Sequence, residues 1–187
     1  ELINKLLAVE DESILFDVSY SEGALQIDFP HHTPSEQGKQ EVRRYVANWF
    51  DLDTDLQPFY AMAASDPVLQ EVVQQHAGLR VMGLPDLFEA LSWAVIGQQI
   101  NLTFAYTLKR RLIENFGSSL TVDDVDYWAF PSAETIASLQ VEQLRTLQFS
   151  GRKAEYLIQI AQELASGRLV KDELIGQTEQ QVEQQLV

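Results

Sequence analysis

The sequence contains no cysteine among its 187 residues. This absence excludes a disulfide framework, a cysteine zinc site and an iron–sulfur cluster held by cysteine, and it is compatible with a reducing cytoplasm. No apolar run approaches the length that spans a bilayer, so we expect no membrane partner. The first residues show neither an initiator Met nor the pattern of a signal peptide. The sequence therefore reads as a trimmed piece of a cytoplasmic protein.

Positive charge is also scarce. Lys and Arg number 13 against 28 Asp and Glu, which gives a formal net charge of −15 and a pI near 4.4. If this charge were spread evenly it would repel a phosphate backbone, so composition alone argues against nucleic acid. Basic residues nevertheless gather at Lys109-Arg110-Arg111 and at Arg152-Lys153. Because binding depends on the local field, these clusters are either phosphate contacts or ordinary solvated helix faces.

Groups for metal or cofactor chemistry are few as well. His31 and His32 lie in a loop bounded by prolines, and His76 stands alone. No Ser-His-Asp arrangement, Walker loop or dinucleotide glycine motif is present. Asp123, Asp124 and Asp126 are interpreted as a solvated loop. We therefore expect no metal and no cofactor.

The hydrophobic pattern changes period along the chain. Residues 14–20 and 25–29 alternate apolar and polar side chains, which predicts a β-hairpin, and residues 6–9 are a candidate third strand. Beyond Pro34 the spacing becomes helical, with a helix over residues 35–50 that is expected to cover the sheet. The fold class is therefore α+β: a small N-terminal antiparallel sheet with a covering helix, followed by a mainly α-helical region.

The remaining chain is predicted to be helical, with no strand beyond Leu84. We expect an N-terminal α+β domain over residues 1–66 and a helical domain over 67–187. Asp86 with Glu89 has the spacing of a capping box. Residues typical of helix starts recur through this region, namely Asp66 before Pro67, Asp86, Asn101, Ser132 and Thr178 with Gln181.

Two segments carry a more specific signal. Residues 88–106 predict two helices joined at a polar corner, Gly97-Gln98-Gln99-Ile100-Asn101. Residues 144–156 contain a tight turn before a helix, Phe149-Ser150-Gly151-Arg152-Lys153. In this order they resemble the helix-hairpin-helix DNA glycosylases, in particular the 3-methyladenine DNA glycosylase II family. The resemblance covers roughly the second half of the chain.

The resemblance implies that the corner enters DNA where a damaged base is flipped out. The hole left by a flipped base costs a few kcal/mol unless a side chain fills it. The candidate wedge residues are Gln98, Gln99 and Asn101. The family often has an apolar residue at the position of Gln99, whereas an amide can also hydrogen-bond the orphaned partner base. The alternative is that these amides only cap helices and bind water.

The resemblance also gives the second turn a role. Backbone N–H groups at a helix N-terminus, with a basic side chain nearby, suit a phosphate oxygen. The candidate phosphate contacts are Ser150, Gly151, Arg152 and Lys153. The alternative is a purely structural turn between helices.

The family's defining hairpin and its catalytic aspartate are not found in this sequence. We therefore expect a helical glycosylase domain that is truncated at its C-terminus, no catalytic residue in this chain and no activity of the 187 residues alone. A stacking surface for the flipped base would come from aromatic residues, most of which we expect in the core: Trp49, Phe50, Phe59, Tyr60, Trp93, Tyr106, Tyr127, Trp128 and Phe130.

The expected function of the parent protein is base-excision repair. It would hydrolyse the N-glycosidic bond of alkylated bases such as 3-methyladenine in double-stranded DNA, with no obligate protein partner. One alternative is a non-catalytic module that binds DNA damage or protein on the same scaffold. Another is an acidic helical interaction domain with no role on nucleic acid.

Overall fold

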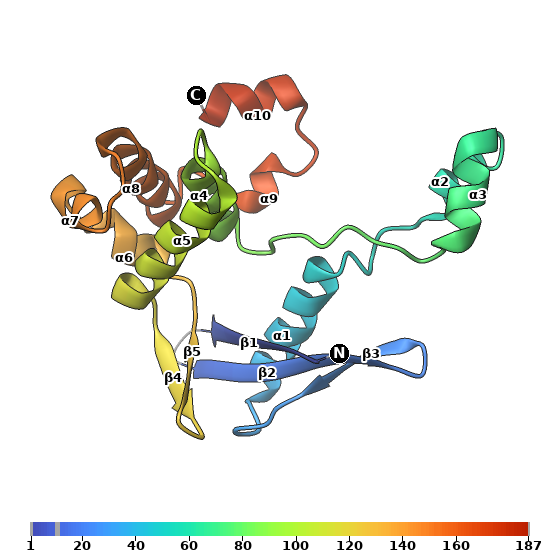
Figure 1. The fold of residues 1–187 in the computed structure, drawn as a ribbon, viewed down its shortest axis with the longest axis horizontal. Helices are drawn as coiled ribbons and strands as arrows, with labels where there is room; N and C mark the ends of the chain where they lie inside the picture. Colours follow the sequence, from blue (N-terminus) through green and yellow to red (C-terminus); the bar gives the residue numbers. More distant parts are fainter. Residues whose placement is uncertain (1, 10–11, 187) are drawn as a thin grey trace. The chain divides into compact units, whose positions relative to one another are not determined.

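The computed structural model describes residues 2–9 and 12–186, and the chain divides into two compact units (Figure 1). Glu1–Thr33 together with Asp86–Val187 form the larger unit, and Pro34–Pro85 form the smaller unit. A proline stands at each end of the smaller unit. Proline fixes its own backbone angle and has no N–H group, which favours a break between elements. The expected domain boundary between residues 66 and 67 stays a prediction.

The larger unit begins with a three-stranded antiparallel sheet in the order β1-β2-β3. Its strands are β1 (Leu2–Val9), β2 (Glu12–Ser21) and β3 (Ala24–Asp28). Leu6 pairs with Leu15 and Tyr20 with Leu25, which confirms the predicted hairpin and the third strand. The turn between β2 and β3 places Gly23 at a φ of 84°. Glycine adopts this left-handed conformation at no steric cost, so the turn can be tight.

A second antiparallel pair corrects the sequence interpretation. Strands β4 (Ser119–Val122) and β5 (Val125–Trp128) form a hairpin, so the expectation of no strand beyond Leu84 is wrong. Asp123 and Asp124, interpreted as loop residues, form its turn at φ values of 50° and 62°. Each strand has only 4 residues, and Asp-Asp is a weaker signal for this turn than Asn-Gly or Asp-Gly.

The β4–β5 hairpin packs beside the first sheet within the larger unit (Figure 1). Leu6 and Leu15, paired across β1 and β2, form a buried cluster with Ala129, which follows β5. Side chains of both β4 and β5 surround this cluster. The hairpin therefore joins the sheet to the helices that follow it.

The rest of the larger unit is helical, as predicted. Its main core contains Ile96, Leu112 and Leu157, all fully buried, and draws on helices far apart in the sequence. None of the helices among the described residues is long and apolar enough to cross a membrane. The helices are α4 (Leu87–Gly97), α5 (Leu102–Phe116), α6 (Ala133–Ala137), α7 (Val141–Thr146), α8 (Gly151–Ala165), α9 (Lys171–Leu174) and α10 (Glu179–Leu186).

The predicted helix starts are confirmed. Side-chain oxygens of Asp66, Asp86, Asn101 and Ser132 each accept a hydrogen bond from a backbone N–H in the first helical turn. The capping box at Asp86 forms only in part. Asp86 Oδ1 accepts from Glu89 N at 2.6 Å, but the Glu89 side chain is buried and binds Lys109 Nζ at 2.7 Å instead. Glu89 therefore serves as a buried ion-pair partner.

The smaller unit contains α1 (Glu36–Trp49), α2 (Gln57–Ala63) and α3 (Pro67–Gln75). The helix expected over residues 35–50 is confirmed as α1, while its packing on the sheet stays a prediction. Gly78 N donates a hydrogen bond of 2.8 Å to Tyr60 Oη, and Arg80 Nη1 donates one of 2.9 Å to Thr54 O. These bonds hold the segment that follows α3 against α2 and the turn that precedes it.

Candidate nucleic-acid interface

The polar corner predicted from the sequence joins α4 to α5. Gln98 ends α4, and Asn101 caps α5 because its Oδ1 accepts a hydrogen bond of 2.8 Å from Phe104 N. Ile100 packs against the main core. The backbone that follows Gln99 is thus fixed by packing and by a helix cap.

Gln99 is the exposed tip of this corner. Its φ of 54° lies in the left-handed region, which costs a residue with a Cβ roughly 1–2 kcal/mol. Within residues 2–9 and 12–186, no hydrogen bond of its side chain is found. The Gln99 side chain is therefore exposed and unengaged within the described residues.

The second predicted turn has the same local arrangement. Gln148 has a φ of 74°, the next residue Phe149 is buried in the main core, and Ser150 caps α8. Ser150 Oγ accepts a hydrogen bond of 3.3 Å from Lys153 N. Here, however, the glutamine side chain is engaged: Arg111 Nη1 donates to Gln148 Oε1 at 2.5 Å and to Leu147 O at 3.2 Å.

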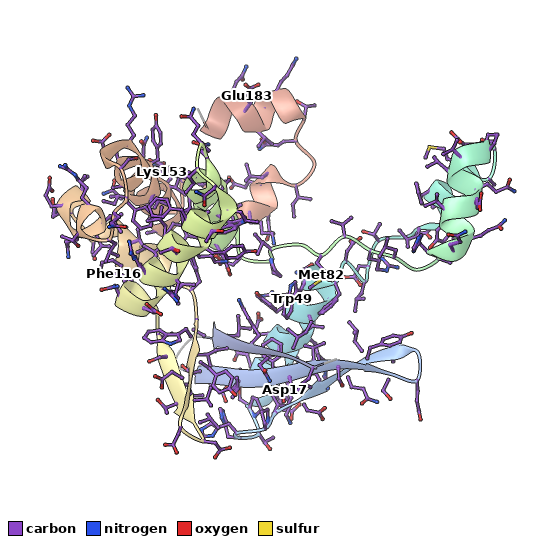
Figure 2. The ribbon with its side chains drawn as sticks, in the orientation of Figure 1. Asp17, Trp49, Met82, Phe116, Lys153 and Glu183 are labelled. Carbon is purple, nitrogen blue, oxygen red and sulfur yellow. The ribbon has the colours of Figure 1, made fainter. Side chains whose placement is uncertain are left out.

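Lys153 connects the two predicted segments. Its Nζ donates hydrogen bonds of 2.6 Å to Ile96 O and 2.8 Å to Gln98 O, at the C-terminal end of α4. Figure 2 labels Lys153 among the side chains of the helical region. Burial lowers the pKa of the Lys153 ammonium below its ordinary value. The structure therefore brings together a residue predicted as a phosphate contact and the corner predicted as a wedge.

The other predicted site residues differ in whether they form hydrogen bonds within the protein. The Asn101 side chain serves as a helix cap, and the carbonyl of Gln98 is held by Lys153. Arg152 is exposed, and its neighbour Gly151 opens α8. Asn101 and Ser150 are exposed but serve as helix caps. The side chains of Gln98, Gln99 and Arg152 are exposed, and no hydrogen bond of theirs is found in the described part of the chain.

The basic cluster Lys109-Arg110-Arg111 is occupied by contacts within the protein. Lys109 Nζ lies 2.7 Å from Glu89 Oε1, and Arg110 Nε lies 3.7 Å from Glu114 Oε1. Arg111 bonds the second turn, as described above. Contacts within the protein thus account for Lys109 and Arg111, whereas Arg110 is exposed and pairs with Glu114 on the surface, so its association with phosphate stays a prediction.

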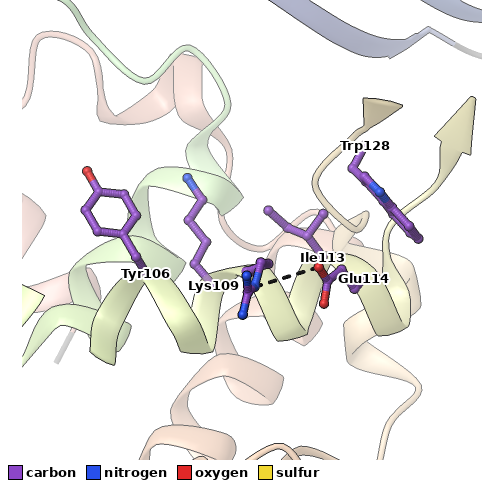
Figure 3. A pocket seen from close by; sticks show the side chains of 6 residues that line it. Tyr106, Lys109, Ile113, Glu114 and Trp128 are labelled. Atoms are coloured by element: carbon purple, nitrogen blue, oxygen red, sulfur yellow. Dashed lines mark ion pairs between the residues drawn. The ribbon is translucent and has the colours of Figure 1, made fainter. Parts of the chain in front are cut away.

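A hollow of about 410 Å³ lies along α5 beside the second hairpin (Figure 3). Tyr106, Lys109 and Trp128 are among its lining residues, and Tyr106 and Trp128 are exposed. The nearby Trp93 ring lies 5.0 Å from the Tyr106 ring at a tilt of 48°, and the Lys109 ammonium lies 5.1 Å from the Trp93 ring centre. This cation–π site is therefore filled by the protein itself.

No group of three or more metal-ligating side chains of His, Cys, Asp or Glu is found in the described part of the chain.

The signal that sequence reasoning missed was the position of Lys153. A cation in the first turn of a helix faces the positive end of the helix dipole, which is unfavourable. Such a lysine is expected to reach for an acceptor elsewhere. The sequence could not say which acceptor, because Ile96 and Gln98 lie 57 and 55 residues away along the chain.

Comparison with known proteins defines the class of this fold. The family model of the HhH-GPD superfamily of base-excision DNA repair proteins matches residues 92–184. The model of the 8-oxoguanine DNA glycosylase N-terminal domain matches residues 4–91. The chain belongs to the HhH-GPD superfamily of DNA glycosylases, which confirms the resemblance seen in the sequence.

Individual relatives refine this placement. The DNA-3-methyladenine glycosylase of Bacillus subtilis is 42% identical over 189 residues, covering 100% of this chain and 62% of the relative. The structure of a 3-methyladenine DNA-glycosylase from Archaeoglobus fulgidus matches with a TM-score of 0.69 at 22% identity, covering 86% of this chain and 55% of that one.

A structure with DNA bound shows the same fold. The Clostridium acetobutylicum 8-oxoguanine glycosylase/lyase in complex with dsDNA matches with a TM-score of 0.67 at 18% identity, covering 97% of this chain and 62% of that one. The chain thus spans less than two thirds of the length of each of these proteins.

Proposed function

We propose that the protein acts in base-excision repair by hydrolysing the N-glycosidic bond of alkylated bases such as 3-methyladenine in double-stranded DNA. The observation that carries this proposal is the 42% identity with the Bacillus subtilis DNA-3-methyladenine glycosylase across the whole chain. The proposal applies to the protein at the length of its relatives. We place it in the cytoplasm, where the DNA of such a bacterial relative lies.

Base flipping gives the polar corner its role. An enzyme that acts on a base in a duplex must take the base out of the stack. In our proposal Gln99 enters the space that the flipped base leaves, with Gln98 and Asn101 beside it. Three observations support this assignment: Gln99 is exposed, no hydrogen bond of its side chain is found among the described residues, and its neighbours Gln98 and Asn101 are held in place.

The turn before α8 is proposed to contact a phosphate. The first N–H groups of a helix have no acceptor within the helix, so Gly151 and Arg152 can present theirs to an anion. Arg152 adds an exposed positive charge. Ser150 and Lys153 complete the set of candidates, although Lys153 Nζ already has two acceptors.

The chemistry needs charge stabilisation at the sugar. As the bond breaks, positive charge develops on the sugar ring, and a carboxylate placed near it lowers the barrier. A cationic alkylated base is a good leaving group, so little acid assistance and no cofactor are needed. We assign no residue of this chain to the carboxylate role, and we expect no base release by the 187 residues alone.

A second lesion class has specific support. The N-terminal family model that matches residues 4–91 describes an 8-oxoguanine DNA glycosylase. Oxidised guanine is therefore the competing substrate. The non-catalytic module that binds damage without cutting remains the alternative from another class.

Base release separates these possibilities. The protein is incubated with a methylated duplex, with a duplex containing 8-oxoguanine and with an undamaged duplex, and free base is measured. We expect release from the methylated duplex by the product of the full coding sequence. Release from the 8-oxoguanine duplex only would overturn the alkylated-base assignment. Binding to damaged duplex with no release from either would favour the non-catalytic module.

A further inference from the structure

The end of α4 depends on a lysine from another helix. The last carbonyls of a helix have no partner within it, and they form the negative end of the helix dipole. The last turn of α4 has no basic residue of its own. Lys153 of α8 supplies the missing cation, donating to Ile96 O and Gln98 O at 2.6 and 2.8 Å. The positive charge of Lys153 is unfavourable at the start of α8, where its backbone lies. The same charge is favourable at the end of α4, where its ammonium lies.

This placement competes with a phosphate role for the same ammonium. To reach a phosphate, Lys153 would have to give up two short hydrogen bonds to carbonyls, one of them partly buried. A partly buried carbonyl that loses its partner carries the desolvation cost of an unmade hydrogen bond. Arg152, the exposed neighbour, can meet a phosphate without this loss.

The bond to Gln98 O also completes the restraint on the tip. Gln99 stands between Gln98, held by Lys153, and Asn101, held as a helix cap. Without the lysine, the strained backbone of Gln99 would be restrained firmly on one side only. The strain would then relax by local movement of the corner.

From this geometry we infer that Lys153 is a positioning residue that fixes Gln99 in its wedge orientation and contacts no phosphate. The inference rests on the wedge role proposed above for Gln99. Lys153 stands in the first turn of α8, so the same bonds also keep the wedge and the phosphate-binding turn at a fixed spacing.

The first test removes the donor and follows the salt dependence of binding. The Kd for a duplex with an abasic-site analogue is measured at several salt concentrations for the wild type, Lys153→Met, Lys153→Arg and Arg152→Met. We expect Lys153→Met to weaken binding about tenfold with an unchanged salt slope, and Lys153→Arg, which keeps two donors, to restore most of the affinity. Arg152→Met is the matched control and should reduce the slope by about 0.9, the value for one phosphate.

Combination with the wedge variant tests whether the lysine acts through Gln99. In a Gln99→Ala background, Lys153→Met should weaken binding less than about twofold, because the side chain to be positioned is gone. Additive losses, or a salt slope reduced by about 0.9 in Lys153→Met, would instead make Lys153 a phosphate contact and overturn the inference.

A measurement without DNA keeps the test independent of the proposed function. Amide hydrogen exchange across residues 97–101 should be faster in Lys153→Met than in the wild type or Lys153→Arg, while residues 14–20 of the sheet stay unchanged. Unchanged exchange at the corner overturns the inference even if the protein proves not to bind lesions. Equal binding of damaged and undamaged duplex by the wild type would overturn the proposed function alone. If Lys153→Met fails to fold, Lys153→Gln, with a shorter donor, serves in both measurements.

Discussion

The corner at Gln99 and the turn at Gln148 share a backbone conformation but differ in how the glutamine side chain is bonded. Each has a glutamine in the left-handed region, followed by an apolar residue that packs in the core and then by a helix cap. At the second turn Arg111 binds the glutamine side chain, whereas no such bond is found for Gln99 among the described residues. The shared backbone is therefore structural, and the unengaged side chain is what distinguishes the candidate wedge.

The largest expected effect separates the two glutamines in binding. Gln99→Ala should weaken binding to an abasic-analogue duplex by about ten- to a hundredfold, because the gap left in the stack is no longer filled. Gln148→Ala should change this affinity less than about threefold, since that glutamine bonds Arg111.

Single-stranded DNA and a distant glutamine provide the controls for this comparison. A single strand leaves no hole to fill, so Gln99→Ala should bind it as the wild type does. Gln159→Ala removes an exposed glutamine in the middle of α8 and should leave both affinities unchanged. Equal losses on duplex and single strand for Gln99→Ala would point to a general defect of the fold.

The next effect concerns stability at the second turn. Arg111→Ala removes the donor to Leu147 O and Gln148 Oε1, so the free energy of unfolding should fall by about 1–2 kcal/mol. Urea denaturation measures this change. Arg110→Ala, which removes only an exposed ion pair with Glu114, is the matched control and should cost less than about 1 kcal/mol. An equal loss in both variants would mean that Arg111 stabilises the turn at Gln148 no more than an exposed ion pair does.

Relief of backbone strain should give a smaller effect of opposite sign. Glycine adopts positive φ freely, so Gln99→Gly should raise the free energy of unfolding by about 0.5–1 kcal/mol while losing lesion affinity as Gln99→Ala does. Gln148→Gly gains the same relief but loses the bond to Arg111, and we expect a net change near zero. Destabilisation by Gln99→Gly would show that the glutamine side chain supports the fold.

Local features of both loops were predictable from the sequence, and the contacts between them were not. Asn101 was expected as a cap because capping depends on residues within one turn. The same local logic explains the confirmed strands and helix starts. The β4–β5 hairpin was missed because its strands are short and its turn is Asp123-Asp124. Glu89 was assigned to a capping box because its ion pair with Lys109 of α5 depends on packing between helices.

In the candidate site, too, local features were predictable from the sequence and contacts between distant segments were not. The wedge and phosphate candidates were selected by resemblance to a family, and the structure leaves those roles as proposals. What it adds is the bond from Lys153 to the end of α4, which requires α8 to pack against α4. A period of 3.6 predicts both helices, but nothing in it determines which two ends meet.

The smallest expected effect is a pH dependence of the free energy of unfolding. It should arise at the charged cap of α4, Asp86, and not at the neutral cap of α5, Asn101. Burial raises the pKa of Asp86, while its bond from Glu89 N and the charges of Lys171 and Lys5 lower it less. Above its ordinary pKa of 3.8 the folded state therefore holds more protons at Asp86 than the unfolded state. This group's contribution to the free energy of unfolding must fall as the pH rises through that window, and it is constant above the folded-state pKa.

Asp86→Asn keeps an oxygen for Glu89 N and removes a partly desolvated charge, so relative to the wild type it should gain stability as the pH rises from about 3.5 to 7. Urea denaturation of both proteins at each pH measures the difference, in which the other carboxyl groups cancel. Asn101→Asp is the converse change at a cap whose hydrogen bond is exposed rather than partly buried, and it should produce no comparable decline, because water solvates the charge there. A constant difference between wild type and Asp86→Asn at all pH values would mean that the α4 cap is as well solvated as the α5 cap, and that this contrast between the two helix caps does not exist.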